Sequence, residues 1–258
     1  LFRSEEFLNE PAFESIASLP LVEIEKIGDS APEPLPQGGS APLDGIRALG
    51  MGHVIAGAGV GRALALHGAD VLNIWRPSDW EVDTTYYTAN VGMRSAMLEL
   101  SDEAAHERMM KLLQDADIFF ANRRPSYLER FGLSAEQSAA VRPGIIHVSV
   151  SLNGEEGMWA DRIGFDQTAG TLTGVMSLEG TADKPELPPI LVVNDYIISW
   201  LASAGAMAAL ARRATEGGSY RVHISLSRVS LWLMSLGLFD KEFAHTTAGS
   251  SDEHLYLD

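Results

Sequence analysis

Asp195 occupies a position where its carboxylate could take part in catalysis. Asp195 lies between an apolar, strand-like run at 190–193 and an alanine-rich stretch over 195–215 that predicts a long helix. Unpaired N–H groups and the helix dipole stabilise an anion at a helix start by about 0.3 to 1 kcal/mol, so this position predicts an ionised carboxylate. Backbone donors there could also stabilise the oxyanion of an acyl transfer. By position alone, an aspartate that only caps the helix is the more common case.

A glycine cluster at 57–61 resembles a phosphate-binding loop, because it falls between a predicted strand and a predicted helix. In the nicotinamide fingerprint a third glycine follows the second by three residues, and Arg62 occupies that position here. The next strand ends in Trp75 and Arg76 in place of the acid that binds the ribose. We therefore predict no NAD or FAD site.

Other features of the composition exclude several kinds of catalytic and metal-binding site. The chain has no cysteine, which excludes disulfides, a cysteine nucleophile and thiolate metal ligands, and which fits an intracellular, cytoplasmic protein. Its seven histidines show no metal-site spacing, so we predict no metal. We also expect no membrane span, because no uncharged apolar stretch approaches about 20 residues.

The net charge bears on the partners of the protein. A formal charge of −16 argues against nucleic-acid binding, which takes most of its affinity from clustered Lys and Arg. An anionic small molecule would therefore need a local basic pocket.

Alternating strand and helix signals predict the architecture. We expect strands over 45–49, 70–74, 118–121, 145–150 and 220–226, and helices over 60–67, 101–116, 134–141 and 195–215. Such a sequence is typical of the α/β class, with a Rossmann-like open, mainly parallel sheet and helices on both faces.

The N-terminal part differs in composition. Residues 29–42 are rich in proline and glycine and are expected to be a linker. Before it, residues 1–28 hold a short acidic helical stretch at 4–16 and an apolar run at 19–24. We expect a main domain over 43–258, with a polar tail from 245.

A series of phrases in this chain resembles the family III CoA transferases of the CaiB/BaiF type, which include formyl-CoA transferase and carnitine CoA-transferase. The run Pro42-Leu-Asp-Gly-Ile-Arg47 is similar to the family's PLxGIR, and Glu216 to Leu226 is similar to its RTGRGQxVDVSL. Further matching phrases, in family order, lie at 53–71, 90–100, 116–132, 142–149 and 164–174. The resemblance implies the Rossmann-like large domain of that family and an interlocked homodimer.

The resemblance also implies a reaction. Asn194-Asp195-Tyr196 stands in place of the family's catalytic phrase, which makes Asp195 the expected nucleophile of CoA transfer between an acyl-CoA and a carboxylic acid through an aspartyl-CoA thioester. Positions matching the CoA-binding residues of the family are His53, Val54, Arg76, Leu98, Asn122 and Arg130. Arg123, Arg124 and Arg162 are unmatched basic neighbours, and arginine suits phosphates because its planar fork makes bidentate bonds. Each arginine alone is more often a solvated surface side chain, and His53 could be a histidine that only holds a turn.

Two alternatives stay open. In related racemases a histidine precedes the aspartate at 166, but Phe165 occupies that position here and cannot move a proton, so a CoA-thioester racemase or isomerase is disfavoured. Asp166 is then expected to hold a turn. The second alternative is a non-catalytic half that serves CoA binding or dimerisation. Residues 5–11 resemble the late part of the family's small domain, and the family's second half has no counterpart after 258, which indicates a fused or truncated variant.

Overall fold

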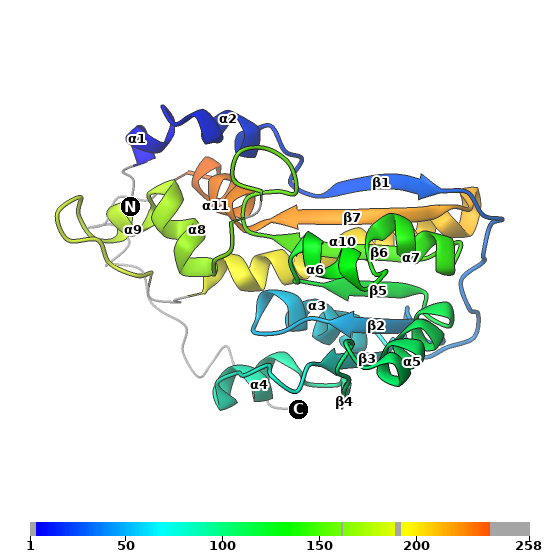
Figure 1. The fold of residues 1–258 in the computed structure, drawn as a ribbon. Helices are drawn as coiled ribbons and strands as arrows, with labels where there is room; N and C mark the ends of the chain where they lie inside the picture. The colour runs from blue at the N-terminus through cyan, green and yellow to red at the C-terminus, as the bar shows by residue number, and fades with distance from the viewer. Residues whose placement is uncertain (1–3, 161, 189–191, 238–258) are drawn as a thin grey trace.

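A seven-stranded sheet forms the centre of the protein in a computed structural model that describes residues 4–160, 162–188 and 192–237 (Figure 1). The strands are β1 (Glu23–Gly28), β2 (Arg47–Met51), β3 (Asp70–Trp75), β4 (Arg94–Met97), β5 (Ile118–Ala121), β6 (Ile146–Ser151) and β7 (Ser219–Ser225). Their spatial order is β1-β7-β6-β5-β2-β3-β4, and of these strands β1 alone runs antiparallel to its neighbour. The predicted mainly parallel α/β sheet is confirmed.

Helices cover both faces of the sheet. They are α1 (Ser4–Phe7), α2 (Pro11–Ala17), α3 (Ala56–Leu66), α4 (Asp83–Ala89), α5 (Glu103–Gln114), α6 (Pro125–Arg130), α7 (Ala135–Val141), α8 (Asp166–Thr173), α9 (Val175–Glu179), α10 (Val193–Glu216) and α11 (Leu226–Ser235). One apolar core joins α3 and α10 to one face of the sheet, and a second joins α5, α6 and α7 to the other. This is the layering that buried parallel strands require. Within the described residues no helix is long and apolar enough to span a membrane.

Capping residues explain where several helices begin and end. Ser134 and Gln137 form a capping box at the start of α7, as the sequence predicts for a helix that begins there. The cap of α5 is Asp102, whose carboxylate accepts the N–H of Ala105, so this helix begins two residues later than expected. Helix α10 ends at Glu216, and its C-cap residue, Gly217, has a positive φ of 65°.

The glycine cluster at 57–61 lies inside helix α3 and does not form the expected turn before it. A Cβ at Gly57 would collide with Asn122, one at Gly59 with Ser199 of α10, and one at Gly61 with Phe120 of β5. The glycines therefore let α3 approach its neighbours on several sides. The predicted helix start at 60 was wrong, because close packing keeps these glycines helical.

The N-terminal segment joins the same sheet. Strand β1 pairs with β7, and Phe7, Ala12 and Ile16 form an apolar cluster with Trp159. Residues 29–42 contain no helix or strand. They are held instead by Glu33, whose carboxylate receives two hydrogen bonds from Arg142 at 2.6 and 2.8 Å.

Two expected features lie partly or wholly outside the described residues. The strand expected at 190–193 falls partly outside the described residues, and Val193 is already helical, so the helix begins two residues before its predicted start at Asp195. The polar tail expected from 245 lies outside the described residues.

Candidate active site

The loops that follow β2 and β5 meet where the strand order reverses. From β2 the chain runs outward through β3 and β4, and β5 then returns to pair with the other side of β2. Open α/β sheets bind ligands at such a switch point, outside the carboxyl ends of the strands. His53 follows β2 and Asn122 follows β5, so the fold places both at this point.

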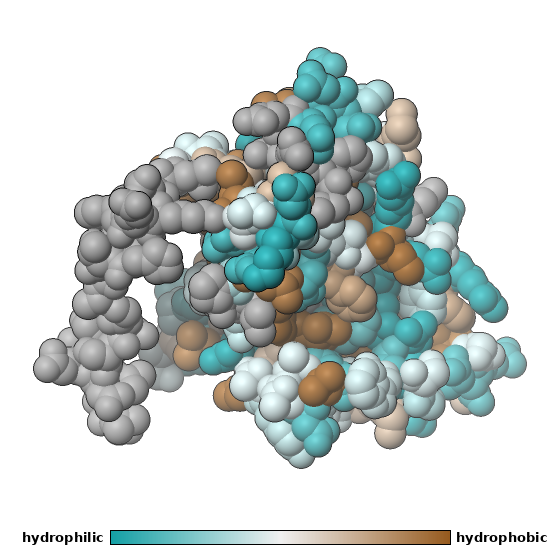
Figure 2. Space-filling model, turned by 90° about the vertical axis from the view of Figure 1, so that its left-hand side faces the viewer, coloured by the Kyte–Doolittle hydropathy of each residue, from teal (hydrophilic) through white to brown (hydrophobic). Residues whose placement is uncertain are grey.

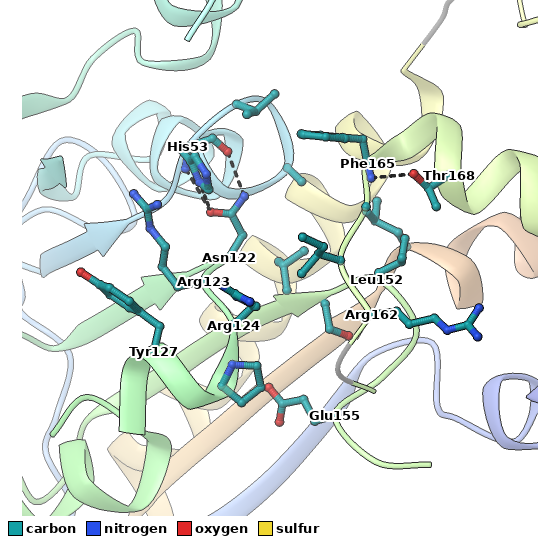
Figure 3. A pocket seen from close by; sticks show the side chains of 18 of the residues that line it. His53, Asn122, Arg123, Arg124, Tyr127, Leu152, Glu155, Arg162, Phe165 and Thr168 are labelled. Carbon is teal, nitrogen blue, oxygen red and sulfur yellow. Dashed lines mark hydrogen bonds between the residues drawn. The ribbon is translucent and has the colours of Figure 1, made fainter. Parts of the chain in front are cut away.

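Three hydrogen bonds join His53 and Asn122. Asn122 Oδ1 accepts the backbone N–H of His53 at 3.1 Å and lies 2.7 Å from its Nδ1, while Asn122 Nδ2 donates to the His53 carbonyl at 2.9 Å (Figure 3). Because an amide oxygen only accepts, Nδ1 carries the ring proton. Burial, with help from the Arg123 charge, lowers the pKa of His53, so the ring is neutral. The next residue, Val54, has a φ of 57°, a strained conformation for a β-branched residue and one that clusters at functional sites.

A cavity of about 540 Å³ opens at this edge of the sheet. Its walls come from the ends of β2, β3, β5 and β6 and from the segment before α8, and they include His53, Val54, Arg76, Asn122, Arg123, Arg124, Tyr127, Ser151, Glu155, Arg162, Ile163, Phe165, Thr168 and Asp195. Figure 2 looks onto the same edge of the molecule and shows hydrophobic surface in its recessed centre with hydrophilic residues around it. The cavity has the size and mixed lining of a small-molecule site.

Asp195 is the third residue of α10 and is 5% exposed, yet it belongs to the wall of this cavity. Burial, and then the charge of Asp166, raise the pKa of its carboxyl group to about 7. Among the described residues, no hydrogen bond to this carboxylate opposes the shift. The expected stabilisation of the anion by the helix start was therefore wrong, because desolvation outweighs the helix dipole at this position.

Asp166, the first residue of α8, holds the start of α10. Its Oδ2 accepts the backbone N–H of Asp195 at 2.8 Å, and its Oδ1 accepts Nδ2 of Asn194 at 3.3 Å. The side chain is fully buried, and burial raises its pKa although these bonds oppose the shift. The structure thus gives Asp166 the turn-holding contacts that the sequence predicts for it.

Asp79, a buried acid, forms ion pairs with two arginines of the cavity wall. Asp79 receives hydrogen bonds from Nε and Nη2 of Arg76 at 2.8 and 2.6 Å, and its carboxylate also pairs with Arg123. Burial alone would raise the pKa of Asp79, but the bonds from Arg123 and Arg76 hold it well below its usual range. Arg76 also lies 5.2 Å from the centre of the Tyr127 ring. Both guanidinium groups are therefore fixed in place before any ligand arrives.

Two further arginines line the cavity from exposed positions. Arg124 directly precedes α6, and Arg162 lies 4.6 Å above the Trp159 ring. Against them stand the wall carboxylates of Glu155 and Asp195, of which Asp195 is only partly ionised at neutral pH. The cavity is therefore locally cationic on a chain with a formal charge of −16, as an anionic ligand requires.

The structure brings five of the seven expected site residues together in this cavity, namely His53, Val54, Arg76, Asn122 and Asp195. It places the other two elsewhere: Leu98 is buried in the core beneath α5, and Arg130 is exposed with its guanidinium over the Phe131 ring. Sequence reasoning missed Tyr127, Glu155 and Ser151, which also line the wall. Their place in the sequence could have identified them, because each follows or ends a strand whose carboxyl end lies at the site. Within the described residues no three His, Asp or Glu side chains gather as a metal site would require.

Comparison with known proteins decides the family. The family model described as "CoA-transferase family III" matches residues 43–255. The chain belongs to this family. It is 31% identical over 80% of its length to "Acetyl-coenzyme A transferase nodX" of Hypoxylon pulicicidum, and 29% identical over 78% to "Formyl-CoA:oxalate CoA-transferase" of Streptomyces avermitilis.

Solved structures agree with this family III fold. A CAIB/BAIF family protein from Brucella suis matches with a TM-score of 0.69 at 25% identity, over 76% of this chain and 56% of that chain. The chain covers 36% of the Hypoxylon protein and 51% of the Streptomyces protein. It therefore spans about a third to a half of the length of these curated relatives.

Proposed function

We propose that this chain carries the nucleophile and the CoA-binding wall of a CoA transferase, with Asp195 as the catalytic carboxylate. One observation carries the proposal: Asp195 lines a cavity whose other walls present Arg76, Arg123 and Arg124. An acyl-CoA is a thioester attached to a phosphate-rich tail, so a reactive carboxylate and guanidinium groups in one cavity match its two ends.

The proposed reaction begins with attack of the ionised Asp195 on the thioester carbonyl. The CoA thiolate leaves, and a mixed anhydride forms between Asp195 and the acyl group. The thiolate then attacks the aspartyl carbonyl, which releases the first carboxylic acid and leaves an aspartyl-CoA thioester. A second carboxylic acid reverses these steps and departs as its own CoA ester, regenerating Asp195.

The raised pKa of Asp195 suits this role. A carboxylate taken out of water has lost the hydration that makes carboxylates weak nucleophiles. At a pKa of about 7, a large share of the molecules still hold the ionised form at neutral pH. The charge of Asp166 contributes to the raised pKa of Asp195, and its carboxylate holds the backbone of Asp195 at the start of α10.

The CoA phosphates are proposed to bind near Arg76 and Arg124, and His53 with Asn122 to shape the loop against which the tail lies. Leu98 and Arg130 remain proposed CoA contacts on the family resemblance alone. We further propose that the protein works in the cytoplasm as an interlocked homodimer, and that residues 1–28 derive from a preceding small domain joined by the linker at 29–42.

The test compares Asp195→Asn with Asp115→Asn in the full chain. Asp115 is an exposed acid at the end of α5, outside the cavity wall, so its variant is the matched control for loss of one carboxyl group. Each protein is incubated with succinyl-CoA or acetyl-CoA and a panel of carboxylic acids, and new CoA esters are measured. We expect exchange with the wild type and with Asp115→Asn, and none with Asp195→Asn. Hydroxylamine should trap the wild-type intermediate as a hydroxamate at residue 195.

Other outcomes select the alternatives. Unchanged exchange in Asp195→Asn would exclude this residue as the nucleophile. Binding of CoA with no exchange by any pair of substrates would favour a non-catalytic half. Deuterium uptake at the α-carbon of a branched acyl-CoA, without exchange, would favour a racemase or isomerase; Phe165 in the cavity wall offers no group for that proton transfer.

A further inference from the structure

A serine, a histidine and a glutamate are joined by hydrogen bonds across three adjacent strands. Ser151 ends β6, His223 lies on β7, and Glu23 begins β1. The ladders set Ser149 opposite His223 and His223 opposite Glu23, so the three side chains lie on one face of the sheet. Ser151 Oγ lies 2.9 Å from His223 Nε2, and His223 Nδ1 lies 3.1 Å from Glu23 Oε2.

In the neutral imidazole of His223, the two hydrogen-bond partners select one tautomer. An ionised carboxylate only accepts, so Nδ1 carries the proton and donates it to Glu23, and Nε2 is left with a lone pair facing the serine hydroxyl. Arg221 orients Glu23 through an ion pair at 3.4 Å. The histidine is 3% exposed, so water competes little for its ring nitrogens. This is the arrangement in which a histidine can take the proton of a serine hydroxyl.

The serine is also reachable. Ser151 is half-buried and belongs to the wall of the same 540 Å³ cavity as Asp195. Its oxygen accepts the N–H of Gly154 at 2.9 Å, so the hydroxyl proton is directed to His223. In the family phrase RTGRGQxVDVSL an aspartate stands at the position of His223, so this chain departs from that phrase at the residue on which the arrangement depends.

We propose that Ser151, His223 and Glu23 form a Ser–His–Glu relay that makes Ser151 a second acyl acceptor in the cavity and gives the protein acyl-CoA thioesterase activity. The inference rests on the proposed function, since it needs an acyl-CoA in this cavity. Its product differs from that of transfer, because water and not a second carboxylic acid receives the acyl group.

The proposed hydrolysis has two stages, acylation of Ser151 and then hydrolysis of the resulting ester. Ser151 Oγ bonds to the thioester carbonyl carbon while His223 Nε2 takes the hydroxyl proton. The carbon–sulfur bond then breaks, and the CoA sulfur leaves with that proton as a thiol, which leaves an ester on Ser151. A water molecule attacks the ester, His223 takes one proton from it and returns that proton to Ser151 Oγ, and the free acid departs. Glu23 keeps its hydrogen bond to Nδ1 throughout and acts as a positioning residue.

A fluorophosphonate probe tests the relay without any CoA, because such probes react with serines that a neighbouring base activates. Labelled peptides of the full chain are mapped by mass spectrometry. We expect label on Ser151, a loss of labelling rate of about 100-fold or more in His223→Asn, and no label at this position in Ser151→Ala. Ser149→Ala is the matched control, because this buried serine lies two residues earlier on the same strand and has no hydrogen-bond partner among the described residues.

Glu23 provides a graded variant that preserves the fold. Glutamine at position 23 keeps an oxygen that can accept the Nδ1 proton, so Glu23→Gln should lose less labelling than Glu23→Ala. Equal labelling in all three would show that Glu23 has no part in activating the serine. Thermal unfolding of each variant identifies any that have lost the fold.

Hydrolysis is then measured without a second acid, as free thiol released from acetyl-CoA or succinyl-CoA. Release that disappears in Ser151→Ala and persists in Ser149→Ala supports the proposal. Release unaffected by Ser151→Ala, or a wild-type Ser151 that the probe leaves unlabelled, overturns it. Because labelling needs no CoA, a labelled Ser151 in a protein that exchanges no CoA would refute the proposed function and leave the relay standing.

Discussion

Asp166 Oδ2 accepts the backbone N–H of Asp195 at 2.8 Å, so two acids meet at the first turn of α10. The bond holds the helix start, and the charge of Asp166 adds to the burial that raises the pKa of Asp195 to about 7. One contact thus positions the proposed nucleophile and tunes its protonation.

Asp166→Asn should shift the pH dependence of CoA transfer. The proposed transfer needs the ionised Asp195, so the wild-type rate should rise as pH increases through about 7. Asparagine keeps an oxygen for the Asp195 N–H and removes the negative charge, so the pKa of Asp195 falls and the midpoint of the rise moves to lower pH. The measurement is the initial rate from pH 5 to 9. An unmoved midpoint would show that Asp166 does not influence the titration.

Asp195→Asn should stabilise the fold at high pH. The folded pKa of about 7 lies above the ordinary aspartate pKa of 3.8, so the native state holds a proton that the unfolded chain releases between these values. Stability from this group is therefore present at low pH and is lost as pH rises from about 4 to about 7, by at most about 4 kcal/mol. Urea unfolding at pH 8 should show the variant to be more stable than the wild type, with the difference shrinking towards pH 4. A constant difference would contradict the raised pKa.

Arg124→Gln should weaken CoA binding without loss of stability. Arg124 is exposed in the cavity wall, whereas Arg76 and Arg123 are paired with Asp79 and would leave a buried carboxylate behind if removed. Loss of one charge-assisted phosphate contact should raise the Kd for CoA about tenfold. Titration calorimetry measures this, and the effect should shrink at high salt. Arg108→Gln on the exposed face of α5 serves as the control and should bind as the wild type does.

Arg213→Met should destabilise the protein at a distance from the cavity. The Arg213 side chain is 2% exposed, and its Nη1 lies 3.0 Å from Asp117 Oδ1 and 3.1 Å from the Gly144 carbonyl oxygen. Removing one partner of a buried ion pair costs about 3 kcal/mol or more, since the remaining charge loses its compensation. Chemical denaturation should show this loss at pH 7. A loss below about 1 kcal/mol would indicate that Arg142, which also contacts Asp117, replaces the missing charge.

The sequence predicted the sheet better than it predicted the site. Strand β5 lies over the predicted residues, because a short buried β-branched and aromatic run leaves little choice of register. Strand β4 and helix α4 were missed, since β4 is exposed along its length and carries no apolar alternation. The pKa of Asp195 could not be predicted either, because it depends on burial and on Asp166, which is distant in sequence and becomes a neighbour only in the fold. Arg130 and Leu98 lie outside the cavity wall, and their contacts with CoA stay predictions.

The three glycines of α3 have a practical consequence. They seat the helix directly on Asn122, Ser199 and Phe120, so a side chain at Gly57, Gly59 or Gly61 would collide with these neighbours. The same helix contributes Ala56 to one side of the cavity. The opposite side presents Ile163 and Phe165, whose side chains are 69% and 62% exposed. An engineer who wishes to alter which acyl groups enter should therefore randomise Ile163 and Phe165 and leave the glycine-bearing helix unchanged.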